Sequence, residues 1–171
     1  MRCFIAINLP ERVKKEIEKI QESLPEFKGK KTEPENLHLT LKFLGEIGKN
    51  DVLEVMERLR RVNINEFEAE IDSLGFFDNR KSRKYDRQMI VWLHMTNCDL
   101  LQREIDNALE EIFEKENRFM SHITIARAKG MKDKNIFTEK IKGIKPGRIS
   151  LNIRDFFLIE SKLREKGPKY D

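Results

Sequence analysis

The sequence predicts an α+β fold with two pseudo-symmetric lobes, each an antiparallel sheet with helices on its outer face, around a central cleft. The first observation behind this prediction is an order of elements, strand–helix–strand–helix–strand, that the chain of 171 residues contains twice. The second is that corresponding elements of the two copies are separated by a nearly constant stretch of chain. Such self-similarity is typical of two lobes related by a twofold pseudo-symmetry.

Apolar periodicity and turn residues define the elements of the first copy. The opening segment is short and rich in β-forming residues, and Pro10 then begins an amphipathic helix that ends near Pro25. Leu37 starts a strictly alternating apolar run, and Asn50 or Asp51 can cap a second helix. The expected elements are strands at 2–8, 37–44 and 67–77 and helices at 11–24 and 51–62.

The second copy follows a basic stretch at 80–87 that shows no apolar periodicity and is expected to form a loop. Its charged residues, with Tyr85 among them, are Arg80, Lys81, Arg83, Lys84 and Arg87. The elements beyond it are strands at 89–95, 122–127 and 149–160 and helices at 99–113 and 133–144. We therefore expect one bilobal domain, 1–171, with approximate lobe repeats 1–79 and 88–161.

Composition excludes several classes of protein. No apolar run approaches the roughly 20 residues of a membrane span, and two cysteines cannot form a disulfide framework or a four-ligand zinc site. The 34 basic and 30 acidic residues give a net charge of +4, which fits a solvated surface as well as a polyanion-binding one. We expect a cytoplasmic protein, and the excess of Lys and Glu indicates a heat-adapted source.

An H-x-T pattern lies inside one strand of each copy. Because side chains alternate along a strand, His38 and Thr40 share one face, as do His122 and Thr124. If the lobes face each other, two imidazoles and two hydroxyls meet in one site. This set suits phosphoester hydrolysis, in which one imidazole activates water and the other protonates the leaving oxygen. The hydroxyls can donate to the phosphoryl oxygens.

Two cations stand near the motifs and can offset charge on a phosphate. Lys42 is either such a ligand or a surface residue of its strand. Arg127 has the opposite parity from His122, so a regular strand directs it away from the site unless the strand bends. The third histidine, His94, also has a threonine two positions later, Thr96, but only His38 and His122 occupy equivalent points of the two copies, and His94 is interpreted as structural. We expect no metal or other cofactor, because the spacings H-x-H and H-E-x-x-H are absent.

The sequence resembles the two-histidine phosphoesterase superfamily, and most closely its RNA 2',3'-cyclic phosphodiesterases, historically called 2'-5' RNA ligases. The resemblance spans nearly the whole chain and rests on RCFIAINLP, LHLTLKFLGE, SHITIARAK and FFLIESKLREKGPKYD. It implies metal-independent hydrolysis of RNA 2',3'-cyclic phosphate ends to a 2'-phosphate. By motif position, His38 would be the proton donor to the 3'-oxygen and His122 the proton acceptor that activates water. Thr40 and Thr124 would bind the phosphate, and the resemblance favours a site role for Arg127.

Some alternatives stay open at this point. The family commonly has proline where Ser121 stands, which restores an N–H before the second histidine. The same residues could serve a 2'-5' RNA ligase acting on tRNA halves, or a non-catalytic module that binds RNA ends or nucleotides. The basic loop is either solvated or captures RNA, with Tyr85 stacking on a base. A monomer with no membrane partner is the default expectation, and the pseudo-symmetry makes the two histidines interchangeable in principle.

Overall fold

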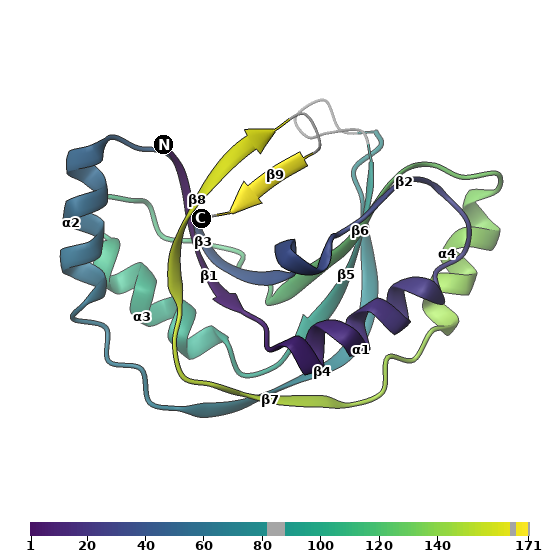
Figure 1. The fold of residues 1–171 in the computed structure, drawn as a ribbon, viewed down its shortest axis with the longest axis horizontal. Coiled ribbons are helices and arrows are strands. Elements are labelled where there is room, and N and C mark those ends of the chain that lie inside the picture. The colour runs from purple at the N-terminus through teal and green to yellow at the C-terminus, as the bar shows by residue number, and fades with distance from the viewer. Residues whose placement is uncertain (82–87, 165–166, 171) are drawn as a thin grey trace.

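The computed structural model describes residues 1–81, 88–164 and 167–170 (Figure 1). Its strands are β1 (Arg2–Asn8), β2 (Lys28–Lys31), β3 (His38–Glu46), β4 (Phe67–Asp78), β5 (Met89–Met95), β6 (His122–Gly130), β7 (Ile149–Ile153), β8 (Phe157–Arg164) and β9 (Gly167–Tyr170). Its helices are α1 (Glu11–Glu22), α2 (Lys49–Leu59), α3 (Asp99–Leu109), α4 (Lys134–Gly143) and a short 3-10 helix, η1 (Pro34–Asn36). The predicted roles of Arg83, Lys84, Tyr85 and Arg87 concern positions outside the described residues.

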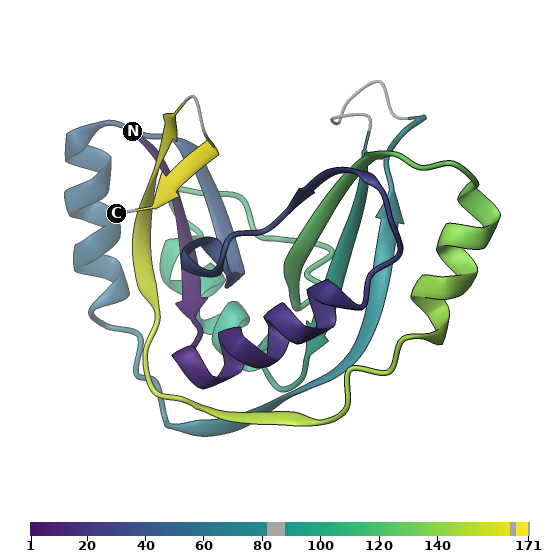
Figure 2. The same ribbon diagram turned by 45° about the vertical axis from the view of Figure 1, so that its right-hand side comes forward.

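All the described strands belong to one antiparallel sheet of nine strands, in the order β7-β4-β5-β6-β3-β1-β8-β9, with β2 paired to β6. The central part, β4-β5-β6-β3-β1-β8, is symmetric about its middle, since β4, β5 and β6 correspond to β8, β1 and β3. One residue pair, Leu39 with Ile123, joins β3 to β6. The two halves of the sheet diverge from this junction like the arms of a V (Figure 2). We call β3-β1-β8-β9 the first lobe and β7-β4-β5-β6 with β2 the second lobe.

The α+β fold and the antiparallel pairing agree with the prediction, but each lobe combines strands from both halves of the chain. β4 comes from the first half and pairs with β5 in the second lobe, whereas β8 pairs with β1 in the first lobe. The single strand predicted at 149–160 is wrong. The chain leaves the sheet after β7, crosses between the lobes and returns as β8. The assignment of 1–171 to one bilobal domain with repeats 1–79 and 88–161 stays a prediction.

The helices exchange between the lobes as the strands do. α1, from the first half, packs on β6 and β7, and α3, from the second half, packs on β3. Both present an apolar stripe to the core, with Val13 and Ile17 in α1 and Leu101 and Ile105 in α3. Full burial of one such side chain contributes roughly 1.5–3 kcal/mol. α2 and α4 lie at opposite ends of the molecule (Figure 1), where α2 packs on α3 and α4 on β4.

Two further findings concern the surface. None of the described helices is long and apolar enough to cross a membrane. At the start of the expected basic loop, the Arg80 guanidinium pairs with the Asp78 carboxylate, with its Nε 2.9 Å from Oδ1. Lys134 contacts the same carboxylate at 2.7 Å. Arg80 and Lys134 therefore share one partly exposed carboxylate, that of Asp78.

Candidate active site

The two H-x-T motifs lie where the two halves of the sheet meet. Leu39 and Ile123, the central residues of the motifs, are paired across the junction and fully buried. The residues that flank them occupy the other face of the sheet and are half-buried; they are His38, Thr40, His122 and Thr124. Continuing this antiparallel register by one residue on either side sets each histidine opposite the threonine of the other motif, and the charge of His122 acts on the pKa of His38. The structure thus brings all four residues to one place.

A β-bulge follows each motif and shifts the alternation of the side chains beyond it. The register between β3 and β1 leaves Leu41 as an extra residue, and the register between β6 and β5 leaves Ile125 as one. Each bulge directs two consecutive residues to the core, so the first seven residues of β3 and of β6 show the same burial pattern. We call these the Leu41 bulge and the Ile125 bulge.

The Ile125 bulge brings Arg127 to the face of the histidines. A regular strand would direct its side chain away from them, as its parity indicates. In the structure Arg127 is exposed, and its charge lowers the pKa of both His38 and His122. Its guanidinium forms no ion pair with any residue that the structure describes, so it can accept an anionic group of a ligand. The corresponding residue after the Leu41 bulge is Phe43, which is 71% exposed.

The Leu41 bulge turns Lys42 to the opposite side, which corrects its interpretation as a phosphate ligand. The side chain is buried, and its ammonium forms an ion pair with Asp106 of α3. The same nitrogen donates to the carbonyl of Glu114 at 2.7 Å. Asp106 is held in turn by the Gln102 amide at 2.7 Å and by the backbone N–H of Glu116 at 2.9 Å. The charge of Lys42 is therefore neutralised in the core and does not reach the site.

Both imidazoles have the same hydrogen bond to the backbone. Nδ1 of His38 lies 2.7 Å from the carbonyl oxygen of Asn36, and Nδ1 of His122 lies 2.7 Å from that of Met120. A carbonyl only accepts, so Nδ1 carries the proton that is donated. In the neutral ring the lone pair is then on Nε2, which is the atom able to take or return a proton. The structure shows the same tautomer at two equivalent positions.

Burial lowers the pKa of both histidines. Burial is the largest cause that lowers the pKa of His38 from 6.5 to about 4; the charges of Arg127 and His122 contribute to this shift, and the hydrogen bond to the Asn36 carbonyl opposes it. Burial also lowers the pKa of His122, with a smaller contribution from Arg127. Aromatic rings provide part of this environment: Phe4 lies 4.9 Å from His38 and Phe77 lies 5.5 Å from His122, between ring centroids. Near neutral pH both imidazoles are therefore favoured in the neutral form.

The hydroxyls of Thr40 and Thr124 make no hydrogen bond within the described part of the protein. Both side chains are half-buried on the face of the histidines. A half-buried hydroxyl in this position can donate to an oxygen of a ligand. Together with the Arg127 guanidinium, they provide the groups that a phosphate needs between two imidazoles.

Two residues beside His122 have contacts that the sequence patterns did not predict. His94 pairs with His122 in the register of β5 and β6, and its Nδ1 lies 2.7 Å from Oδ1 of Asp72. From the sequence His94 is interpreted as structural, and the structure places it directly beside the site. Ser121, at the position of the family's proline, is buried, and its carbonyl accepts a hydrogen bond from the Met95 N–H at 3.4 Å. These contacts depend on the pairing of β5 with β4 on one side and with β6 on the other.

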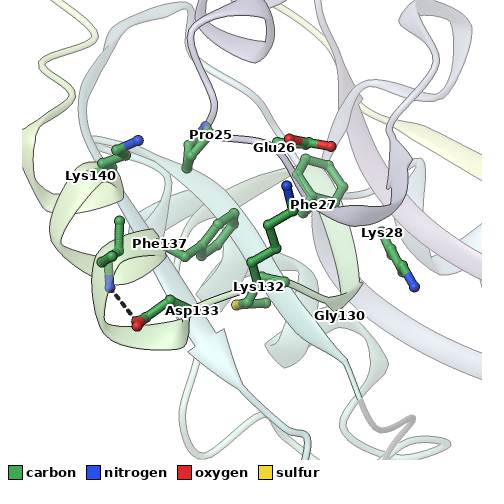
Figure 3. A pocket seen from close by; sticks show the side chains of 11 residues that line it. Pro25, Glu26, Phe27, Lys28, Gly130, Lys132, Asp133, Phe137 and Lys140 are labelled. Carbon is green, nitrogen blue, oxygen red and sulfur yellow. Dashed lines mark hydrogen bonds between the residues drawn. The ribbon is translucent and has the colours of Figure 1, made fainter.

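A cavity of about 520 Å³ lies elsewhere, between the segment before β2 and the start of α4 (Figure 3). Phe27 and Phe137 line it, with the lysines 28, 132 and 140 around them. None of the residues expected in the site lines this cavity. Among the described residues, no group of His, Cys, Asp or Glu is arranged to hold a metal ion.

The fold and the paired motifs define a class, the two-histidine phosphoesterases, and a family model described as LigT like Phosphoesterase matches residues 7–85. The chain is 33% identical to the RNA 2',3'-cyclic phosphodiesterase of Methanocaldococcus jannaschii, over 100% of this chain and 97% of that protein. It is 34% identical to the Thermotoga maritima protein of the same name, over 99% and 91%. The chain belongs to the RNA 2',3'-cyclic phosphodiesterase family. A solved structure from Thermus thermophilus shares the fold, with a TM-score of 0.81, 24% identity, and coverage of 100% of this chain and 94% of that one.

Proposed function

We propose that this protein hydrolyses the 2',3'-cyclic phosphate at an RNA 3' end to a 2'-phosphate, by acid–base catalysis with His38 and His122. The observation that carries the proposal is the pair of imidazoles, each with its Nδ1 hydrogen-bonded to a backbone carbonyl, at the junction of β3 and β6. The names of the relatives in Methanocaldococcus jannaschii and Thermotoga maritima supply the substrate.

In the proposed reaction, the cyclic phosphate lies between the two histidines. His122 accepts a proton from water through Nε2, water attacks phosphorus, and the bond to the 3'-oxygen breaks as His38 donates a proton to that oxygen. Thr40, Thr124 and Arg127 bind the non-bridging oxygens, whose charge increases in the transition state. Lys42 has no part in this reaction because its ammonium is buried against Asp106.

Burial lowers the pKa of both histidines, so the assignment of acid and base rests on motif position and not on these shifts. A neutral His122 is ready to accept a proton, and the anionic substrate would favour protonation of His38 once bound. The pH profile of kcat/KM reports the free protein, in which the pKa of His38 is about 4 and that of His122 is below 6.5. We therefore expect a bell-shaped profile with its maximum below pH 6.5.

The test is hydrolysis of a nucleoside 2',3'-cyclic phosphate and of an RNA with that end, with the product identified by its phosphate position. We expect a 2'-phosphate, the same rate with EDTA present, and loss of activity in His38→Ala and in His122→Ala. Full activity of either variant would exclude the acid–base pair, and loss of activity in EDTA would indicate a metal. Joining of two RNA halves in place of hydrolysis would favour the ligase.

The proposed setting is the cytoplasm and the proposed state is a monomer. Cys3 and Cys98 are both buried and unpaired, which suits a reducing compartment. All the proposed site residues come from one chain, so a second copy is not needed to complete the site. RNA 3' ends with a cyclic phosphate, tRNA fragments among them, are the proposed partners.

A further inference from the structure

The geometry of the site depends on the Leu41 and Ile125 bulges, because each bulge decides which residues reach the face of the histidines. Without the Ile125 bulge, Arg127 would point to the core, and without the Leu41 bulge, Lys42 would occupy the place of Phe43. A bulge interrupts regular pairing, so the extra residue or its direct neighbour needs other contacts that hold it. Both bulges have such contacts, and both come from a helix of the other half of the chain.

Gln21, in the last turn of α1, makes the contact at the Ile125 bulge. Its side chain is only 4% exposed. Its Nε2 donates to the carbonyl oxygen of Ile125 and to that of Thr32, both at 2.8 Å. The backbone N–H of Thr32 donates to the same Ile125 oxygen at 2.9 Å. The carbonyl of the extra residue therefore accepts two hydrogen bonds, and one amide fixes it to α1 and to the segment after β2.

The Lys42–Asp106 pair makes the contact at the Leu41 bulge. Lys42 follows the extra residue directly, and its ammonium is tied to Asp106 of α3 and to the carbonyl of Glu114. Asp106 also accepts from the backbone of Glu116, in the segment that leads to His122. The pair thus connects the strand of His38 to the chain that precedes the second histidine.

The chemistry of this pair indicates a role beyond filling space. A buried ion pair is often no more stabilising than apolar side chains of similar volume, because both ions lose their hydration. The equivalent position after the Ile125 bulge is Ala126, which is fully buried, so an apolar residue is compatible with this geometry. The pair differs from an apolar contact because it fixes the orientation of the groups around it. Each oxygen of the Asp106 carboxylate and the Lys42 ammonium has a specific hydrogen-bond partner.

We propose that Gln21 and the Lys42–Asp106 pair are positioning residues, which fix the two bulges and thereby orient the histidine and threonine side chains and Arg127 toward a bound phosphate. They act through the backbone and touch no substrate. This inference rests on the proposed hydrolysis of the cyclic phosphate. In this proposal α1 positions the motif of His122, and α3 positions the motif of His38.

Gln21→Met tests one contact and the double variant Lys42→Met/Asp106→Asn tests the other, since it leaves no lone buried charge. With a nucleoside 2',3'-cyclic phosphate we expect each to lower kcat/KM on the order of a hundredfold, as for a displacement of about 1 Å in a site. The matched control is Thr138→Val in α4. Thr138 is buried and donates only within its own helix, to Asn135 at 3.1 Å, so its loss should leave kcat/KM unchanged.

A spectroscopic titration separates positioning from general loss of stability. The chain has three histidines, so the Hε1 signals of His38, His94 and His122 can be followed individually in proton NMR. In Gln21→Met we expect the pKa of His122 and of His38 to rise, because Arg127 moves away from both. Thr138→Val should leave the titrations of His38 and His122 as in the wild type even where its melting temperature falls.

Two results would overturn the inference: wild-type kcat/KM in both bulge variants, or kcat/KM losses that match those of Thr138→Val at equal loss of stability with unchanged titrations. A failure of the proposed function can be distinguished from a failure of this inference. If the wild type did not hydrolyse the cyclic phosphate, the NMR titrations of the same variants would still show whether Gln21 and the Lys42–Asp106 pair orient the histidines.

Discussion

The two histidines of the site share a hydrogen bond to a backbone carbonyl, but their surroundings differ. His38 lies against Phe4, which is almost fully buried, and the exposed ring of Phe43 lies 6.1 Å beyond Phe4 between centroids. His122 lies between Phe77 and His94, with Arg127 three positions beyond Thr124 on the same strand. Corresponding positions of the two lobes thus hold an aromatic ring and a cation, and the symmetric fold presents an asymmetric site.

The pKa of His38 predicts how stability depends on pH. Burial lowers this pKa to about 4 in the folded protein from 6.5, so the unfolded chain binds a proton that the folded protein excludes. Proton binding to His38 of the unfolded chain therefore does not reduce the free energy of unfolding above pH 6.5. It reduces this free energy progressively as the pH decreases from 6.5 toward 4. In His38→Gln we expect a smaller fall over the same range. Urea midpoints measured between pH 4 and 8 test this, and identical pH dependence in the two proteins would contradict it.

Removal of the Arg127 charge should change both kcat/KM and the pKa values of the two site histidines. In Arg127→Met we expect kcat/KM to fall on the order of a hundredfold, because a charged donor to the phosphate is lost. The pKa values of His38 and His122 should rise, since the charge that lowers them is removed. Lys129→Met is the control, because Lys129 is exposed two residues further along the same strand. The pH profile of kcat/KM measures both effects, and equal losses in the two variants would argue against a specific role.

At the scale of elements, local patterns predicted most helices and strands but not the geometry that completes the site. The 3.6-residue period of Ile17 in α1 and Ile105 in α3 and the alternation around His38 and His122 follow from side-chain burial alone. The bulges do not, because an extra residue is visible only in the pairing with a neighbouring strand. For the same reason strand alternation alone directs Arg127 away from the site, although the family resemblance favours a site role, and it does not reveal the burial of Lys42.

The strand β2 is the clearest omission. Its sequence, KGKK, has no apolar residue and every side chain is exposed, so no periodicity indicates a strand. It forms because its backbone pairs with β6, from Lys28 opposite Gly130 to Lys31 opposite Ala126. Gly29 has a φ of +149°, and a Cβ there would collide with the carbonyl of Arg127. The element is therefore defined by one glycine and by the edge of β6 beyond the junction with β3.

This predicts that Gly29→Ala destabilises the protein by about 1–3 kcal/mol, from backbone strain and overpacking. Because the clash is with the backbone of Arg127, we also expect a higher KM for the cyclic phosphate. The control is Gly143→Ala at the end of α4, where a Cβ meets nothing within 4 Å. Alanine there should leave stability equal or slightly higher. Urea unfolding of both variants, with KM measured on the folded protein, tests the prediction.

At the scale of the whole molecule, the exchange of elements ties the two lobes together. β4, from the first half of the chain, completes the second lobe, and β8, from the second half, completes the first (Figure 2). In the same way α1 packs on the second lobe and α3 on the first. Sequence repeats indicated the pseudo-symmetry, but pairings between distant strands decide which copy of an element joins which lobe. A phosphate between His38 and His122 would therefore contact two lobes that cannot separate without unfolding.

The exchange predicts that the protein unfolds in one cooperative transition. Removing either lobe would expose the apolar faces of strands and helices that come from both halves of the chain, so neither lobe is stable alone. Trp92 is the only tryptophan and lies in β5 of the second lobe, whereas far-UV circular dichroism reports on both lobes. We expect the two signals to give the same urea midpoint and slope. A fragment of residues 1–79 should be unfolded, and a separate Trp92 transition or a folded fragment would show that the lobes are independent.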